Sequence, residues 1–239
     1  MALKQTGPIW QEPPKVRALL VRRVCERLER TYGAPRLGNP LDPLDDLVFI
    51  ILSNKTTPLL AKATYGTLKS QFSTWEDLRR GCTNSRLVSL LRPAGLSRVK
   101  ARQLLDIFNR LIADFGLCAL DTLKTVADEE ALTYLTSLPG VSDKVARCIL
   151  MYSFDRGVLP VDSHVHRIAR RLGWTARKRA DQCHEELESL VSSDRRFAFH
   201  VDCVVHGRSV CRPSNPACDQ CCINRYCAYY ANRSNGFPS

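Results

Sequence analysis

Cysteines crowd the C-terminal part of this sequence in a pattern that is typical of metal sites. Five of the eleven cysteines fall within residues 211–227, and four of them follow the spacing C-x6-C-x2-C-x5-C, at Cys211, Cys218, Cys221 and Cys227. Four thiolates can hold a 4Fe–4S cluster or a tetrahedral zinc ion, and the spacing alone leaves both open. We interpret Cys222 as a spare thiol. The other cysteines are scattered singly, and most of them are predicted to be small buried apolar residues.

A second candidate site is the segment Leu138-Pro-Gly-Val-Ser-Asp-Lys144, which joins two expected helices. Gly140 permits a tight turn and a close backbone approach that a side chain would block. With Ser142 as the expected N-cap, amides at the start of the next helix would face outward, where a phosphate oxygen can accept their hydrogen bonds. A plain corner between two helices explains the turn equally well.

The charge balance favours a polyanionic partner. Thirty-five Lys and Arg against twenty-four Asp and Glu leave a net charge of +11 and a pI near 9.3. Residues 164–180 contain no acid and six basic residues, Arg167, Arg170, Arg171, Arg177, Lys178 and Arg179. Each phosphate contact by such residues releases a condensed counterion, so nucleic acid is the expected partner. A generally basic surface is the alternative.

The composition excludes several classes of protein. The 239 residues are 44% apolar and 25% charged, which is typical of globular chains rather than of disordered, collagen-like or coiled-coil ones. The longest apolar run, Leu47–Leu52, is far shorter than the ~18 residues that a membrane span needs. The first eight residues contain no apolar stretch that could act as a secretory signal. We therefore expect an intracellular protein.

The elements that must position these residues are all predicted to be helices. Apolar residues recur with helical spacing, and neither an alternating strand nor a two-residue hairpin turn is present. The predicted helices are Val16–Tyr32, one opened by Asp42-Pro43, one from Thr57-Pro58 to about Ser70, one capped by the box Ser73–Glu76, one capped by Ser97 and stopped by Gly116 after it, those capped by Asp128, Ser142 and Asp162, and those over about 178–191 and 197–206.

We predict two helical domains after a disordered arm over residues 1–15. The central domain covers residues 37–155 and includes the hairpin. The second combines residues 16–36 with residues 156–239, because the chain must return to cover the apolar stripe of the first helix. The cleft between two such lobes is the expected ligand site.

Three motifs together resemble the helix-hairpin-helix DNA glycosylases. They are the hairpin Leu138–Lys144, the segment Val161-Asp-Ser-His-Val-His-Arg167 and the cysteine cluster, which places the chain with the iron–sulfur branch typified by endonuclease III. The resemblance runs from about Val16 to Tyr230. It implies an all-α fold with two lobes and a DNA cleft, a C-terminal loop around a 4Fe–4S cluster rather than zinc, and duplex DNA as the partner of a monomer.

The resemblance also implies two catalytic residues. Lys144 matches the family's nucleophile, a neutral amine that attacks the sugar C1′, expels the base and forms a Schiff base, from which β-elimination cuts the strand. Asp162 matches the family's aspartate, which accepts the lysine proton or stabilises the positive charge that develops on the sugar. Without the motif, Lys144 would be a solvated helix lysine and Asp162 an ordinary N-cap.

Further positions match the family's DNA-contacting loops. The loop Ser53–Thr57 corresponds to the segment that fills the gap left by a flipped base, and it carries Lys55 where glutamine is common. Leu96 corresponds to a second wedge, with a core leucine as the alternative. Gly140, Ser142, Arg170 and Arg171 complete the expected DNA contacts. Ser142 replaces a glycine and Pro58 an acidic residue, so the target base stays open, and residues 160–174 also resemble plant glycosylases that excise 5-methylcytosine.

The expected function is base excision repair by a bifunctional DNA glycosylase and abasic-site (AP) lyase that removes a damaged or modified pyrimidine. One alternative is an AP lyase with little base excision, since the base-reading loop departs from the family pattern. Another is a non-catalytic iron–sulfur DNA-binding protein, which the presence of both Lys144 and Asp162 disfavours. The expected location is wherever the genome lies.

Overall fold

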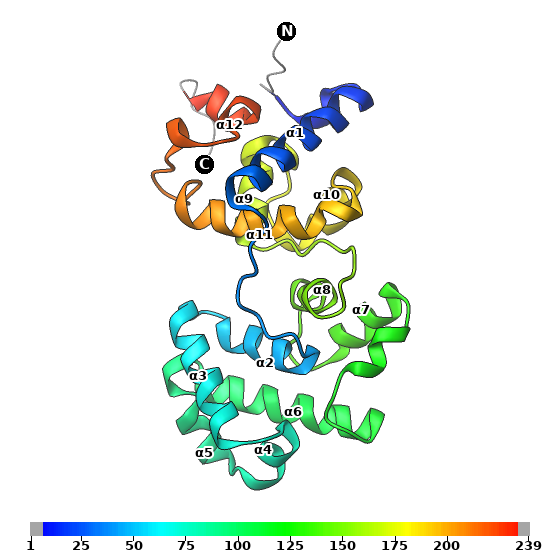
Figure 1. The fold of residues 1–239 in the computed structure, drawn as a ribbon, viewed down its shortest axis with the longest axis vertical. Helices are drawn as coiled ribbons and strands as arrows, with labels where there is room; N and C mark the ends of the chain where they lie inside the picture. Colours follow the sequence, from blue (N-terminus) through cyan, green and yellow to red (C-terminus); the bar gives the residue numbers. More distant parts are fainter. Residues whose placement is uncertain (1–6, 234–239) are drawn as a thin grey trace. The chain divides into compact units, whose positions relative to one another are not determined.

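The computed structural model describes residues 7–233, and every regular element in this range is helical (Figure 1). The α-helices are α1 (Pro14–Tyr32), α2 (Pro43–Ser53), α3 (Pro58–Gln71), α4 (Trp75–Gly81), α5 (Asn84–Leu90), α6 (Ser97–Phe115), α7 (Asp128–Ser137), α8 (Asp143–Tyr152), α9 (Ser163–Leu172), α10 (His184–Leu190), α11 (Ser193–Ser209) and α12 (Ala228–Ala231). The described residues contain no strand, so the all-α prediction is confirmed. No helix within residues 7–233 combines the length and apolar character that a bilayer-crossing segment needs.

The chain divides into two compact units. One unit is the continuous stretch Gly38–Arg156, which holds α2 to α8 and is called the hairpin unit below. The other joins the chain up to Leu37 to the chain from Gly157 onward, holds α1 and α9 to α12, and is called the cysteine unit. These boundaries lie one residue away from those predicted for the central domain.

In the hairpin unit, α2 is the buried helix. The Asp42 carboxylate caps it by accepting hydrogen bonds from the amides of Leu44 and Asp45 at 3.0 and 2.9 Å, and Pro43 fills the first helical position. The helix contacts α3, α6 and α8 through its apolar run, of which Leu47, Val48, Ile50, Ile51 and Leu52 are buried. The run is therefore a buried helix, as its start signals predict.

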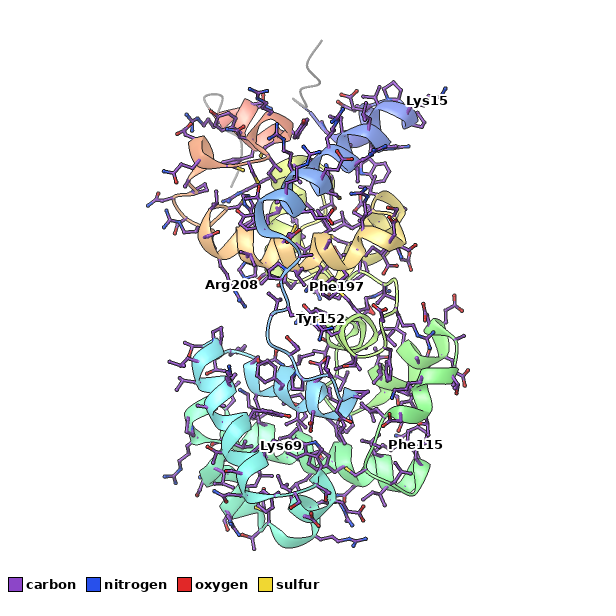
Figure 2. The ribbon with its side chains drawn as sticks, viewed as in Figure 1. Lys15, Lys69, Phe115, Tyr152, Phe197 and Arg208 are labelled. Carbon is purple, nitrogen blue, oxygen red and sulfur yellow. The ribbon has the colours of Figure 1, made fainter. Side chains whose placement is uncertain are left out.

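The long helix α6 runs across the hairpin unit (Figure 1), and two aromatic residues of its C-terminal half contact other helices. Trp75 of α4 stacks on Phe108 with ring centroids 5.8 Å apart. Phe115, labelled in Figure 2, lies against Tyr134 of α7 with ring centroids 5.0 Å apart. These aromatic contacts fix α4 and α7 on the same helix.

In the cysteine unit, α11 is the central helix and packs against α1 and α9. The predicted stripe of α1 is buried at Leu20, Val24 and Leu28, each at most 1% exposed. Beyond α9, Trp174 stacks on Phe199 of α11 with ring centroids 5.4 Å apart. Helix α9 thus lies on α11 along its apolar face, with its own end at Gly173 in the left-handed region.

Three predicted helix starts shift by one residue. The capping box of α4 consists of Thr74 and Asp77 rather than of Ser73 and Glu76. The sequence contains both pairs, one residue apart and with the same spacing, so the pattern alone does not choose between them. Ser97 and Asp128 lie inside α6 and α7 instead of before them.

The predicted helix over residues 178–191 is correct only in its second half. Helix α10 begins at His184, and a short 3-10 turn, Ala180–Gln182, precedes it. Arg179 and Asp181 form an ion pair there, and residues two apart do not share a face of an α-helix. The short helices α5 and α12 had no predicted counterpart.

The predicted disordered arm is wrong for its described part. Ile9 is fully buried, and its amide donates to the Gly173 carbonyl at 2.8 Å. The Trp10 indole donates to the Trp174 carbonyl at 3.0 Å, and Arg17 lies over the Trp10 ring. Two large apolar side chains between the prolines therefore bind this segment to the cysteine unit. Residues 1–6 of the predicted arm lie outside the described residues.

Candidate functional site

The hairpin between α7 and α8 favours glycine at position 140. Gly140 has φ +68°, and the Val141 amide donates to the Leu138 carbonyl at 3.1 Å to close the turn. A Cβ on Gly140 would lie 2.8 Å from Nε2 of Gln103, so the end of that side chain would have to move. The positive φ is therefore the main reason for glycine, because a larger residue would be strained in this conformation.

Ser142 caps α8, as predicted, and Lys144 follows in its first turn. The Ser142 hydroxyl accepts a hydrogen bond from the Val145 amide at 3.4 Å, so the serine that replaces the family's glycine still serves the helix start. Lys144 is half-buried. Its neighbour Asp143 accepts two hydrogen bonds from Nε of Arg147, at 3.0 and 3.1 Å. Lys144 thus stands at the positive end of a helix, directly after the hairpin.

A buried carboxyl group lies between α2 and the C-terminal end of α8. Asp46 has no exposed surface, and it accepts hydrogen bonds from Nδ2 of Asn39 at 2.6 Å and from the Ser153 hydroxyl at 2.9 Å. Burial raises the pKa of Asp46 to about 6, while these hydrogen bonds and the positive charge of Lys144 oppose the rise. The carboxyl group is therefore electrostatically linked to the proposed nucleophile.

Asp162 is the N-cap of α9. Its Oδ1 accepts hydrogen bonds from the amides of His164 and Val165 at 2.9 and 2.8 Å. The predicted cap is therefore confirmed, and both of its bonds use one oxygen. Asp162 belongs to the cysteine unit and Lys144 to the hairpin unit.

Two exposed loops of the hairpin unit hold the predicted inserting residues. Lys55 is exposed and has φ +54°, and Leu96 is 53% exposed with φ +48°. Non-glycine residues in the left-handed region are uncommon and concentrate at functional sites. The exposure of Leu96 shows that the core-leucine alternative is wrong.

The four cysteines of the spaced motif line one cavity of the cysteine unit. Apolar side chains complete its wall, among them Ile168, Leu172 and Ile223. Burial raises the pKa of the Cys221 thiol to about 12 and that of Cys227 to about 11. Thiols so buried stay protonated unless a metal replaces the proton, because the thiolate is the metal ligand.

Arg171 lies against this cavity and is not available to DNA. It is 9% exposed, and its guanidinium donates to Cys211 Sγ at 3.2 Å and to the carbonyls of Arg212 and Pro213 at 2.8 and 2.9 Å. The predicted DNA contact at Arg171 is therefore wrong, because the C-terminal loop covers the helix face that the basic pattern had indicated as solvent-facing. Arg170 remains partly exposed.

A scan with protein-family models matches residues 48–193 to the HhH-GPD superfamily base excision DNA repair protein model. The match covers the hairpin, Lys144 and Asp162. This chain belongs to that superfamily. The resemblance drawn from the three motifs is confirmed.

Individual members of the HhH-GPD superfamily are similar over most of this chain. Endonuclease III of Thermotoga maritima is 30% identical over 217 residues, which are 91% of this chain and 94% of that protein. A solved non-covalent endonuclease III–DNA complex has a TM-score of 0.78 at 21% identity and covers 91% of this chain and 98% of the other. A thermostable thymine-DNA glycosylase has a TM-score of 0.74 at 20% identity, with 90% and 96% covered. The fold is that of endonuclease III.

Two features of this HhH-GPD chain escaped the sequence analysis. Asp46 lies next to Asp45 in the first turn of α2, and nothing in the local sequence shows which of the two carboxyl groups is buried. His206 lies beside the cysteine cavity, with its Nε2 3.4 Å from Cys221 Sγ and its Nδ1 2.7 Å from the Tyr32 hydroxyl. Burial lowers the pKa of His206 to about 4, so the imidazole is neutral beside the cysteine cavity.

Proposed function

We propose that this chain is a bifunctional DNA glycosylase and AP lyase that removes a damaged or modified pyrimidine from duplex DNA. The observation that carries the proposal is the half-buried Lys144, in the first turn of α8 and directly after the Gly140 turn. A monofunctional enzyme needs no lysine there, since water would be its nucleophile.

The proposed reaction begins with a neutral Lys144 amine. Its nitrogen attacks C1′ of the nucleotide, the bond from C1′ to the base breaks, and the base leaves with the electron pair and takes up a proton. The attached nitrogen loses a proton, the C1′–O4′ bond opens as O4′ takes up a proton, and a protonated Schiff base forms between Lys144 and C1′. This Schiff base makes the C2′ hydrogen acidic, and its removal as a proton expels the 3′ phosphate. Hydrolysis of the remaining imine returns the free amine.

Asp162 supplies negative charge in this scheme. It accepts the Lys144 proton or stabilises the positive charge that develops on the sugar as the base departs. Capping and catalysis are compatible in one carboxylate, because both cap bonds go to Oδ1. The cap also fixes the carboxylate relative to α9.

Duplex DNA is the proposed partner, and the enzyme is proposed to act as a monomer in the compartment that holds the genome. Amides around Gly140 and Ser142 would bind phosphate oxygens, Arg170 would add a phosphate contact, and Lys55 and Leu96 would enter the helix around the flipped nucleotide. The net charge of +11 supports a polyanionic partner.

We further propose that Cys211, Cys218, Cys221 and Cys227 hold a 4Fe–4S cluster. The four thiols line one cavity, which supports a shared group. A zinc ion with Zn–S bonds of ~2.3 Å would draw its four sulfurs to within about 4 Å of one another. Within residues 7–233, no three His, Cys, Asp or Glu side chains are grouped closely enough to hold a metal ion. The proposal of an iron–sulfur cluster rather than zinc therefore rests on the resemblance to the iron–sulfur branch of the family. When bound, the cluster braces the C-terminal loop and takes no part in bond breaking.

Borohydride trapping tests the proposal. The enzyme is incubated with duplexes that carry an abasic site, thymine glycol, uracil, 5-methylcytosine or a T·G mismatch, and the imine is reduced to a stable adduct. We expect adducts with wild type and with Lys124→Ala, a matched loss of an exposed lysine in the same unit, and none with Lys144→Ala. Reaction only at abasic sites would support the AP lyase alternative that the Lys55 departure suggests. No adduct on any duplex, with DNA binding intact, would refute the proposal.

A further inference from the structure

Lys100 is a buried lysine in the first turn of α6, and its side chain joins two loops of the hairpin unit. It is 2% exposed. Its Nζ donates hydrogen bonds to the carbonyls of Leu52 and Asn54 at 2.8 and 2.9 Å. A third bond goes to the carbonyl of Ala94 at 2.8 Å. An ammonium group has three donors, so all of them are used within the protein.

The three carbonyls belong to the loops that carry the proposed inserting residues. Asn54 directly precedes Lys55, and Leu52 lies three residues before Lys55, at the end of α2. Ala94 lies two residues before Leu96. Lys55 and Leu96 are forty-one positions apart in sequence, yet one nitrogen binds the backbone of both loops. A single side chain therefore fixes the distance between them.

The conformation of both loops needs such support. Lys55, Gly95 and Leu96 all have positive φ, at 54°, 69° and 48°. Non-glycine residues keep this conformation only where the surrounding structure holds it. Carbonyls that bind Lys100 lie immediately before each strained segment, so the lysine fixes the chain at the point where it enters the turn.

Stability alone does not explain a lysine at this position. Burial lowers the pKa of Lys100, which means that its charged form is disfavoured by its surroundings. An apolar side chain would avoid that cost, but it could not bind two loops at once. The three well-made hydrogen bonds indicate that the charge serves to order backbone oxygens.

We propose that Lys100 is a positioning residue that sets the spacing of the two loops, so that Lys55 and Leu96 enter the duplex together. The inference rests on the proposed function, since it assigns a role within nucleotide flipping. Lys100 itself touches neither DNA nor the reacting atoms. It acts through the backbone of Asn54 and Ala94.

The test is a flipping assay on the full chain. The probe is a duplex with a tetrahydrofuran abasic analogue opposite 2-aminopurine, whose fluorescence rises when the orphaned base is unstacked. In Lys100→Met, we expect the flipping rate to fall about tenfold to hundredfold, the range that a misplacement of about 1 Å produces. Affinity for an undamaged duplex should stay within about twofold of wild type, because the phosphate contacts are retained.

Two controls separate positioning from general destabilisation. Asn39→Ala removes a hydrogen bond to buried Asp46 in the same unit, and it should lower the melting temperature without slowing flipping. Lys100→Arg keeps the charge but changes the reach and geometry of the donors, and it should slow flipping even if Lys100→Met does not fold. A double-mutant cycle of Lys55→Ala and Leu96→Ala should be non-additive in wild type and additive in either Lys100 variant.

The outcomes distinguish this inference from the proposed function. Wild-type flipping in both Lys100 variants, or an unchanged double-mutant coupling, would overturn the role of Lys100 while leaving the glycosylase proposal intact. Failure of wild type both to raise the 2-aminopurine signal and to form a borohydride adduct at an abasic site would overturn the proposed function instead.

Discussion

Replacing Asp46 by asparagine should remove a defined part of the pH dependence of stability. Asp46 is fully buried, and its pKa rises from 3.8 in the unfolded chain to about 6 in the folded protein. The difference, 6 − 3.8, is about 2 pKa units, and at 1.36 kcal/mol per unit it corresponds to about 3 kcal/mol. A raised pKa means that the stabilising contribution is complete below pH 3.8 and is lost as the pH rises through 6.

The asparagine fits the same hydrogen bonds. Its Oδ1 can accept from Asn39, and its amide can donate to the Ser153 hydroxyl. At pH 7.5 the variant should therefore have a free energy of unfolding higher than wild type by up to about 3 kcal/mol, and the gain should shrink as the pH falls towards 4. Urea unfolding at pH 5.0, 6.0, 7.0 and 8.0 measures this difference. Subtracting the two curves isolates Asp46, because every other titrating group is common to both proteins.

A second variant should change the pH dependence of stability in the opposite direction. Ser153→Ala removes a hydrogen bond that lowers the Asp46 pKa, so the pKa should rise further and the loss of stability with pH should become steeper. Parallel unfolding curves for wild type and Asp46→Asn over this pH range would refute the reasoning, since they would mean that Asp46 titrates alike in both states.

Asp162→Asn should slow base removal while the fold survives, because asparagine also caps helices. Asp162→Ala should slow base removal too and should in addition lose about 1 kcal/mol of stability. Single-turnover excision measures the first effect and urea unfolding the second. Gly207→Ala should cost about 1–3 kcal/mol by overpacking, since its Cβ would lie 2.4 Å from His164 Nδ1 and 3.0 Å from His164 Cβ on α9. Arg170→Ala should lower the slope of log binding constant against log salt by about one unit, while Arg171→Ala should leave that slope unchanged and loosen the cysteine loop.

Specific results would contradict each of these predictions. Equal loss of stability in Asp162→Asn and Asp162→Ala would show that asparagine does not replace the aspartate cap. Slower excision by Asp162→Asn would then reflect the lost cap rather than a lost catalytic carboxylate. Wild-type stability of Gly207→Ala would show that α9 can move away freely from α11. A reduced salt slope in Arg171→Ala, measured by fluorescence anisotropy, would place its guanidinium on DNA after all.

The fold was largely predictable because its start signals are local. Asp42, Ser142 and Asp162 each precede an apolar helical pattern, and each caps the helix that follows. The prediction of a disordered N-terminal arm was wrong for a physical reason. The prolines around Ile9 exclude a long helix, but they do not prevent the Ile9 side chain from being buried. Periodicity describes helices, and an irregular segment that packs through two side chains leaves no period to detect.

Site residues were predictable where a motif carried them and not where tertiary contacts did. Lys144 follows from the resemblance to the family's hairpin motif, and the four cysteines follow from their spacing. Lys100 and Asp46 do not, because a buried charge is indicated only by partners that come from other segments. Arg171 was misinterpreted for the same reason, as the loop that covers it begins forty residues later in the chain.

Helix α9 connects the cysteine loop to the proposed catalytic carboxylate. Ten residues at about 1.5 Å each span about 15 Å, with Asp162 at one end and Arg171, bound to the cysteine loop, at the other. A displacement of the cysteine loop that pulled on Arg171 would be passed along the backbone of α9 to the residue that caps its other end.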